Sequence, residues 1–377
     1  MISKTLKFFV VAGDPSGDLH GAHLINAIQD IQPNSSFMGH GGNKMKDSGM
    51  LIIEHTNELA IMGFWEVVKH LPKMIRIMGE TINTITKAKP DRIILIDYPG
   101  FNLKLAKNIK HLGIPITYFI LPQAWAWKEK RVETLISFID QSFSIFPFEK
   151  TWYDKKGLET TYVGHPLAED KHFNETSKEF YTRHNFSISD PILLLLPGSR
   201  QQEVDKHWEI YLSTALLLKD RIPKLQVLVG KSEYVDLKNI PKSFRIENDS
   251  RKAMTVSTAA IATSGTATLE CLFEETPLVA CYKLSPFSWL LTKLLVKVQF
   301  ASIINLIAGK MVVPELLQNQ CNQDNIIKEV IPLLNIQSKE RNIMIGEFNK
   351  IKKNLGIPGF YFRAAEGIIK KTKESFV

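Results

Sequence analysis

Short apolar runs alternate with amphipathic helical patterns through the first half of the chain. Several of these runs are apolar on both faces, which is typical of parallel strands that helices cover from either side. Strands are therefore predicted at residues 6–12, 92–97, 114–120, 142–146 and 160–163. Helices are predicted between them, at residues 19–30, 101–111, 131–139 and 149–156.

The alternation stops in a polar stretch at residues 165–190, which suits a linker, and then restarts. Further buried strands are predicted at residues 192–196, 225–229, 259–262 and 278–281, with a helix after the first of them that runs through Leu218. Two rounds of alternation predict an α/β protein with two doubly wound, Rossmann-like domains that face a shared cleft. We expect the domains to span residues 1–168 and 169–357, with ligands at the carboxyl ends of the strands.

The composition narrows the class of protein. A chain of 377 residues suggests two domains, and no window has the roughly 18 uninterrupted apolar residues of a membrane span. The first apolar run ends at Asp14, too early for a signal peptide, so a cytoplasmic protein is expected. The three cysteines lack metal-ligand spacing, which indicates a reducing compartment. The net charge of +8 leaves nucleic acid, anionic lipid and a phosphorylated substrate open as partners.

Two turns in the first half carry acidic residues. The turn at residues 13–18 lacks dinucleotide-binding spacing, and its carboxylates suit a site that binds hydroxyl groups. Capping of the next helix by Ser16 or Asp18 is the alternative. Asp97 directly follows a buried strand, where desolvation can raise its pKa toward that of a general base. A simple turn aspartate ahead of Pro-Gly would explain the same residue.

Trp125 and Trp127 lie two residues apart beside polar neighbours. Aromatic side chains can either bind sugars against their faces or pack in the hydrophobic core. The core interpretation is the better one for at least one of the two.

The second half carries features suited to phosphate. Gly198, Ser199 and Arg200 follow a buried strand, and arginine can hold a diphosphate bidentately. Farther on, small residues precede a predicted helix whose N-terminus can present N–H groups to phosphate: Ser264, Gly265 and Thr266. Glu270, about a turn and a half into that helix, can accept both hydroxyls of a ribose. Capping explains the threonines but not the whole string.

No metal and no cofactor are expected, because the chain has no Asp-x-Asp pair, no H-E-x-x-H motif and no Cys/His cluster. His20 and His23 share a helix face without a third ligand, and we predict ordinary surface histidines.

Two segments rich in apolar residues suggest contact with a membrane. Residues 286–300 form an amphipathic helical pattern whose apolar and basic residues suit an interface, with Trp289, Leu290, Lys293, Leu294 and Lys297. The second segment contains Met62, Phe64 and Trp65. Packing against a core is the alternative for both segments, and for either alone it is the better one.

Taken in order, these motifs resemble one family along almost the whole chain. In the first half they are Ser16-Gly17-Asp18, Met62-Gly63, Asp97-x-Pro99-x-Phe101-Asn102, Trp125-Ala126-Trp127, Phe146-Pro147-Phe148-Glu149 and Val163-Gly164-His165-Pro166. In the second half they are the 196–200 and 264–270 segments, Asn305 to Gly309, and Val313 to Gln318. The sequence resembles lipid-A-disaccharide synthase of Gram-negative bacteria. Each motif is weak alone, and ten in order are strong.

The resemblance implies a GT-B fold and a metal-independent inverting glycosyltransferase of lipid A biosynthesis. It joins UDP-2,3-diacylglucosamine to 2,3-diacylglucosamine 1-phosphate through a β(1→6) bond and releases UDP. It implies a peripheral protein on the cytoplasmic face of the inner membrane, no nucleic acid, and a C-terminal helix, within residues 358–377, that packs back on the first domain. It leaves homodimer formation open.

The resemblance also assigns residues. Asp97, Asp18 and Arg200 are the catalytic candidates, with Asp97 as the base. Arg200 and the 264–270 segment hold UDP, and Asn305, Glu315 and Gln318 line the donor site. Ser16, Met62, Phe64 and Trp65 belong to the acceptor and lipid side. Two positions depart from the family: Asp14 replaces a frequent glutamate, and Ile304 replaces a usual proline, which puts the local backbone in doubt.

Three rivals remain. Another GT-B enzyme, such as a peptidoglycan glycosyltransferase or a UDP-sugar 2-epimerase, would share the fold. A non-catalytic lipid-binding relative would bind acyl-glucosamine phosphate without releasing UDP.

Overall fold

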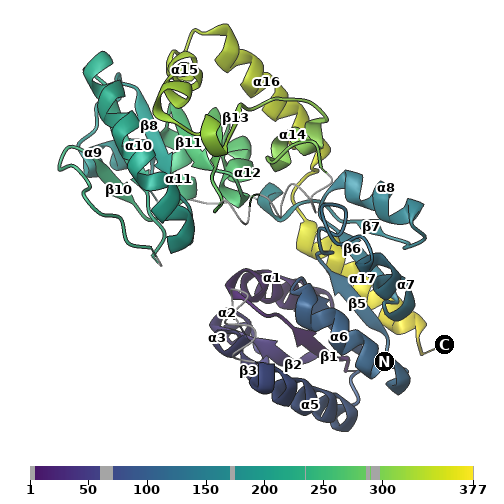
Figure 1. The fold of residues 1–377 in the computed structure, drawn as a ribbon. Coiled ribbons are helices and arrows are strands. Elements are labelled where there is room, and N and C mark those ends of the chain that lie inside the picture. Colours follow the sequence, from purple (N-terminus) through teal and green to yellow (C-terminus); the bar gives the residue numbers. More distant parts are fainter. Residues whose placement is uncertain are drawn as a thin grey trace. The chain divides into compact units, whose positions relative to one another are not determined.

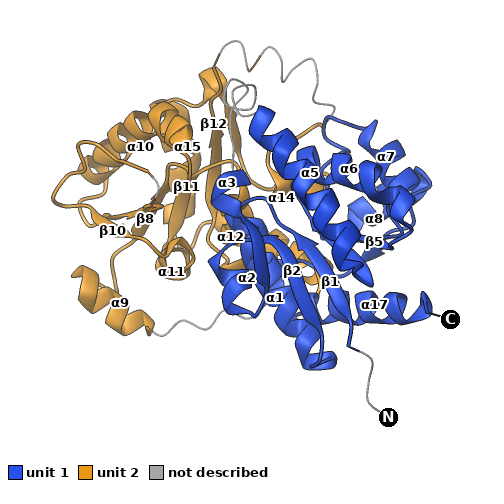
Figure 2. Ribbon diagram, turned by 90° about the horizontal axis from the view of Figure 1, so that it is seen from below, with its two compact units in different colours: residues 1–169, 357–377 blue, residues 170–356 orange. Residues whose placement is uncertain are grey.

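The computed structural model describes residues 5–59, 71–169, 175–233, 235–285, 289 and 298–376. The chain forms two compact units (Figure 2). Unit 1 comprises residues 1–169 together with 357–377, and unit 2 comprises residues 170–356.

Unit 1 is built on a parallel sheet whose strand order is β3-β2-β1-β4-β5-β6-β7. Its strands are β1 (Lys7–Val11), β2 (Ser36–Gly41), β3 (Leu51–His55), β4 (Arg92–Ile96), β5 (Ile116–Phe119), β6 (Gln141–Ser144) and β7 (Thr161–Tyr162). Every residue of β4 is buried, as expected for a central strand covered on both faces.

Helices cover both faces of this sheet and bury two separate apolar clusters. One cluster lies under α1 (Pro15–Ile31) and α17 (Phe360–Glu374), and the other under α5 (Leu71–Ala88), α6 (Pro99–Ile109) and α7 (Arg131–Phe138). Shorter helices complete the unit: α2 (Asn43–Asp47), α3 (Thr56–Leu59), α8 (Pro147–Lys155) and the 3-10 turns Lys110–Leu112 and Pro166–Ala168.

The C-terminal helix α17 belongs to unit 1 although the whole of unit 2 precedes it in the chain (Figure 1). The buried Arg92 side chain donates from Nε to Thr372 Oγ1 over 2.7 Å. Gln141 Nε2 donates to the Gly367 carbonyl over 2.9 Å. Phe360 stacks on Phe119, with 5.3 Å between ring centroids. Polar and apolar contacts together therefore hold the last helix on the sheet.

Unit 2 repeats the architecture with the strand order β10-β9-β8-β11-β12-β13. Its strands are β8 (Ile192–Leu196), β9 (Gln226–Gly230), β10 (Arg245–Glu247), β11 (Ala259–Thr263), β12 (Leu278–Tyr282) and β13 (Glu315–Leu317). Its helices are α9 (Ser177–His184), α10 (Gln201–Arg221), α11 (Ser250–Val256), α12 (Thr266–Phe273), α14 (Ile303–Ala308), α15 (Gln323–Leu334) and α16 (Lys339–Asn354), with a 3-10 turn at Gln318–Gln320.

The two parallel sheets confirm the predicted fold class. One part of the linker prediction is wrong, because residues 165–190 contain helix α9. Thr176 and Glu179 form a capping box at its start, a polar signal that reads like a linker when burial is unknown.

Candidate active site

The candidate residues lie at equivalent places in the two sheets. In unit 1, β1 has β2 on one side and β4 on the other, and in unit 2, β8 lies in the same way between β9 and β11. The strand order reverses at β1/β4 and at β8/β11, which is where ligands bind in doubly wound sheets. The loops that follow β1 and β4 are therefore the candidate site of unit 1, and the loops that follow β8 and β11 are the candidate site of unit 2.

The loop after β1 is ordered by an aspartate cap. Asp14 Oδ1 accepts the Gly17 N–H over 2.7 Å at the start of α1, so the cap is Asp14 and not Ser16 or Asp18. Ser16 is exposed on the first turn of the same helix.

Asp18 is committed to backbone groups. Its buried carboxylate accepts the N–H groups of Gly42, Lys44 and Met45 at 2.7, 3.1 and 3.0 Å. These bonds fix the start of α2 against α1. We therefore assign Asp18 to holding this turn in place rather than to the chemistry.

The turn after β4 has an unusual backbone. Asp97 and Tyr98 both have left-handed conformations, with φ of 41° and 45°, which side chains other than glycine rarely adopt. Asn102 Nδ2 and Tyr118 Oη donate to the Asp97 carbonyl over 2.8 and 2.6 Å. The Asp97 N–H donates to Phe119 O over 3.1 Å. Three hydrogen bonds thus hold the carboxylate-bearing residue in a conformation that it would not otherwise keep.

The two acidic loops of unit 1 contact each other. The Tyr98 ring lies so close to Gly13 that a Cβ at this position would be 2.2 Å from ring atoms. Tyr98 is itself anchored, because its hydroxyl donates to the Leu59 carbonyl over 2.8 Å. Glycine at position 13 thus lets the aromatic ring join the two loops and brings Asp14 near Asp97.

Asp97 has the electrostatics of a base that works near neutral pH. Its side chain keeps access to solvent, yet crowding by the strand end desolvates the carboxylate and raises its pKa to about 6. The negative charge of Asp14 raises this pKa further, whereas a backbone N–H and the charge of Arg131 oppose the rise. The carboxylate is therefore largely ionised at pH 7 and still basic enough to accept a proton.

A second carboxyl group lies behind this site. Glu149 is completely buried and accepts hydrogen bonds from Trp125 Nε1 at 2.9 Å and from the N–H groups of Ile145 and Phe146 at 3.3 Å. Burial raises the pKa of Glu149 to about 7, and the charge of Asp97 adds to this rise. Half-buried Trp125 is thus held against the core, whereas Trp127 is 46% exposed.

The prediction of two ordinary surface histidines is wrong for His20. His20 is half-buried, and its Nδ1 lies 2.8 Å from the Tyr361 hydroxyl. Burial, with His23 adding to it, lowers the pKa of His20 to about 4, so the ring is neutral at pH 7. Its partner lies on α17, 341 residues away in sequence, a distance that no local pattern reveals.

The loop after β8 in unit 2 presents a cation. Gly198 has φ of +124°, and a Cβ there would lie 2.7 Å from the Glu203 Cβ, so the position requires glycine. The Ser199 N–H donates to Glu203 Oε2 over 3.2 Å. The Arg200 side chain is 65% exposed, with its nearest guanidinium nitrogen 3.7 Å from Glu203. Its guanidinium group is therefore available to an anionic ligand.

The loop after β11 leads into an open helix N-terminus. Gly265 is the N-cap of α12, no side chain caps it among the described residues, and a Cβ at this position would have no atom of a described residue within 4 Å apart from its chain neighbours. Thr266 is exposed and Ser264 is half-buried, with its hydroxyl donating to Ala301 O over 3.3 Å. Glu270 is half-buried one turn farther on. This end of α12 can present N–H groups to phosphate.

Three residues expected to line the donor site form hydrogen bonds that hold loops together. Completely buried Asn305 donates to Val313 O and to Glu315 Oε1 at 2.9 and 2.7 Å, and its Oδ1 accepts two backbone N–H groups. Glu315 also accepts the Ala301 and Ser302 N–H groups, at 2.8 and 2.9 Å. Gln318 Oε1 accepts the Leu284 N–H over 3.0 Å. Asn305 thus shapes this region from a completely buried position.

Ile304 fits the position where the family has proline. It lies in the first turn of α14, and its N–H donates to Ser302 Oγ over 3.2 Å. Proline is also tolerated in a first helical turn, so either residue is compatible with this backbone.

Several predicted lipid-side residues lie outside the described part of the chain: Met62, Phe64, Trp65, Leu290, Lys293, Leu294 and Lys297. Trp289 is half-buried, and its N–H donates to Ser285 O over 2.8 Å. Within the described ranges, no helix is long and apolar enough to cross a bilayer, and no three His, Cys, Asp or Glu residues are grouped to hold a metal ion.

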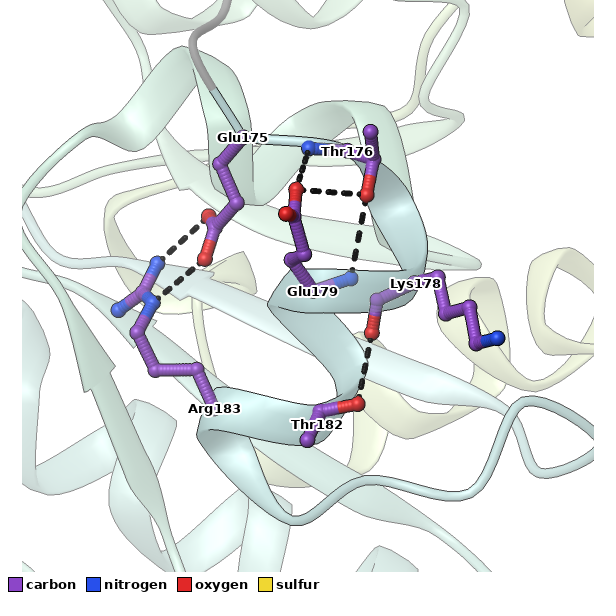
Figure 3. A pocket seen from close by; sticks show the side chains of 6 residues that line it. All are labelled: Glu175, Thr176, Lys178, Glu179, Thr182 and Arg183. Atoms are coloured by element: carbon purple, nitrogen blue, oxygen red, sulfur yellow. Dashed lines mark hydrogen bonds and ion pairs between the residues drawn. The ribbon is translucent and has the colours of Figure 1, made fainter.

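A hollow of about 760 Å³ lies beside the start of α9 (Figure 3). Three of its charged side chains, those of Glu175, Glu179 and Arg183, form ion pairs or hydrogen bonds. Arg183 pairs with both Glu175 oxygens at 2.7 and 2.9 Å, and Glu179 accepts the Thr176 N–H at 2.7 Å. These contacts stabilise the start of α9, and none of the candidate site residues lines the hollow.

Two solved structures with similar folds are a glycotransferase and a UDP-sugar epimerase. The glycotransferase of kitacinnamycin has a TM-score of 0.66 at 12% identity, covering 98% of this chain and 99% of its own. A UDP-GlcNAc 2-epimerase of Methanocaldococcus jannaschii, solved with UDP-GlcNAc and UDP, has a TM-score of 0.63 at 13% identity, covering 97% and 100%. These likenesses, with the two parallel sheets, define a protein of the GT-B class.

Sequence comparisons narrow the class to one family. The family model for lipid-A-disaccharide synthetase matches residues 8–356. The lipid-A-disaccharide synthases of Myxococcus xanthus and Syntrophus aciditrophicus are each 35% identical, covering 96% and 97% of this chain and 97% and 98% of their own. The chain belongs to the lipid-A-disaccharide synthase family. It is a glycosyltransferase of lipid A biosynthesis, and neither the epimerase nor the other rivals are favoured.

Proposed function

We propose that unit 1 binds the acceptor and supplies the general base, and that unit 2 holds the UDP of the sugar donor. The observation that carries this division is Asp97, a carboxylate at a strand end whose pKa is raised to about 6 and whose backbone is fixed by three hydrogen bonds. The donor is UDP-2,3-diacylglucosamine, and the acceptor is 2,3-diacylglucosamine 1-phosphate.

On the acceptor side, Asp97 takes the proton of the 6-hydroxyl as its oxygen attacks the anomeric carbon. The new C–O bond forms on the face opposite UDP, the bond to the diphosphate breaks, and the configuration inverts. Asn102 and Tyr118 aim the base by donating to the Asp97 carbonyl, and they touch no substrate because both side chains are completely buried. Asp14 keeps the pKa of the base high without reacting.

On the donor side, the leaving diphosphate needs positive charge. The exposed Arg200 guanidinium can bind it bidentately, and the N-terminus of α12 adds N–H donors and a favourable helix dipole. Glu270 accepts the ribose hydroxyls in this arrangement. Neither element needs a metal ion, so we propose a metal-independent reaction.

The proposal includes a peripheral position on the cytoplasmic face of the inner membrane, because both substrates carry acyl chains. The segments at 60–70 and 290–297 that the sequence assigns to lipid contact lie outside the described residues. Their apolar and basic side chains still suit an interface.

The test is to incubate the purified protein with both lipid substrates in detergent micelles with EDTA. We expect mass spectrometry to detect the disaccharide 1-phosphate, with one UDP released per disaccharide. Acceptor binding without UDP release would support the lipid-binding rival. Strict dependence on added magnesium would overturn the proposed role of Arg200.

A further inference from the structure

An exposed tryptophan with two cations marks the segment that follows β5. Trp127 is 46% exposed. Lys128 Nζ lies 4.1 Å from the centroid of its ring, and Arg131 Cζ lies 5.4 Å away. These distances are those of cation–π contacts, so one indole ring has both positive charges beside it.

No carboxylate in the described part of the chain forms an ion pair with either cation. The intervening acid, Glu129, pairs with Lys156 instead. Desolvation lowers the pKa of Lys128, and the positive charge of Arg131 lowers it further. Two neighbouring cations that form no ion pair in the described part of the chain favour the binding of an anion.

The cations lie on the same edge of the sheet as the candidate base. Strand β5 pairs with β4, and Ile96 lies opposite Phe119 in the register, so the segments after these strands are neighbours. Arg131 is close enough for its charge to lower the pKa of Asp97. An anion bound here would therefore lie within the acceptor side of the site.

We propose that Lys128 and Arg131 bind the phosphate of the acceptor lipid while the Trp127 face lies against its sugar ring. This inference rests on the function proposed above. Lysine supplies a point charge and arginine a bidentate donor, the two modes by which proteins bind phosphate. An indole face is a platform for a sugar. The phosphate and the attacking hydroxyl belong to the same sugar, so this subsite and Asp97 fix the acceptor at two points.

The experiment compares Lys128→Met and Arg131→Gln with Lys130→Met, a matched control that lies between them and is exposed. Acceptor KM is measured at pH 8, where Asp97 is ionised, for diacylglucosamine 1-phosphate and for its dephosphorylated counterpart in neutral detergent micelles. We expect each test variant to raise KM for the phosphorylated acceptor by about 10-fold or more, since a charged hydrogen bond is lost. KM for the dephosphorylated acceptor and for the donor should change little, and Lys130→Met should behave as wild type.

A wild-type KM for the phosphorylated acceptor in both test variants would overturn the subsite. An equal loss with both acceptors would also contradict it, because the phosphate would then not be what the cations recognise. Loss of sedimentation with vesicles of phosphatidylglycerol, at unchanged KM in neutral micelles, would assign the cations to membrane headgroups instead.

Calorimetric titration of the two acceptors into the protein in the same micelles separates this inference from the proposed function. Preference for the phosphorylated acceptor that depends on Lys128 supports the subsite even if no disaccharide forms. Formation of disaccharide by a protein without that preference leaves the proposed function standing and overturns the subsite.

Discussion

The two units share a strand order around their first strands, yet their loops carry opposite charge. In unit 1 the loops after β1 and β4 carry Asp14 and Asp97. In unit 2 the loops after β8 and β11 carry Arg200 and the open N-terminus of α12. The fold therefore sets where a ligand can bind. A few loop residues determine whether the loop suits a ligand that gives up a proton or one that carries a negative charge.

The loops also differ in how they are held. Asp97 has a left-handed backbone fixed by Asn102 and Tyr118, whereas Arg200 extends from a glycine turn and is 65% exposed. A base must be aimed at one proton, so the proposed role of Asp97 requires a rigid support. A cation that neutralises a diphosphate can adjust through its own side chain.

The largest effect is expected from removing the carboxylate of Asp97 in unit 1. We expect Asp97→Asn to lower kcat by about 10²–10⁴-fold, because the general base is lost. UDP release from both lipid substrates measures the effect. Asp30→Asn, at an exposed position near the end of α1, is the control and should keep full activity.

Removal of the cation from unit 2 should affect two quantities together. We expect Arg200→Ala to lower kcat by about 10²-fold and to weaken UDP binding, because its positive charge acts on the diphosphate before and during departure. Arg221→Ala is the control, because Arg221 lies on the last turn of α10, the helix that Arg200 precedes. Weaker UDP binding with an unchanged kcat would show that Arg200 holds the ground state only.

The support of the base can be tested without touching its carboxylate. We expect Asn102→Ala to lower kcat by about 10-fold at an unchanged donor KM, since misplacement of a catalytic group is costly. The double variant with Tyr118→Phe should lose more, because both side chains hold the same carbonyl. Exposed Asn108 on α6 provides the control substitution. If the double variant kept the wild-type kcat, Asp97 would need no such support.

The smallest expected effect is a shift in pH dependence. Asp97 acts when it is ionised, so kcat/KM should fall as the pH drops through about 6. Asp14→Asn removes a negative charge that raises this pKa, so the acidic limb should move to lower pH. Arg131→Gln removes an opposing positive charge and should move the limb to higher pH. Profiles of kcat/KM from pH 5 to 9 measure these shifts. Shifts of the opposite sign would contradict the assignment of the acidic limb to Asp97.

The fully buried strands were predictable, whereas four partly exposed strands, β2, β3, β10 and β13, were not. Strands β4, β8 and β11 are buried on both faces, so their apolar runs reveal them. Strand β3 is partly exposed along its length, and its mixed pattern carries no comparable signal. Helix α9 has a polar capping box and lies in the stretch that reads as a linker.

For the site, local patterns locate residues but do not show how their polar atoms are used. The strand–turn pattern locates Asp97, yet the support from Tyr118 comes from a neighbouring strand. Asn305 reads as a ligand-facing amide until the fold shows its hydrogen bonds to residues 312, 313 and 315. The contact between His20 and Tyr361 depends on α17 returning to unit 1.

The most direct test of the division between the units is the dissociation constant of UDP for the Asp97→Asn protein, measured by calorimetry beside its turnover. The account predicts wild-type affinity for UDP in a protein that no longer forms the disaccharide. Full turnover would contradict the role of the base, and a loss of UDP affinity that matches the loss of turnover would contradict the division itself.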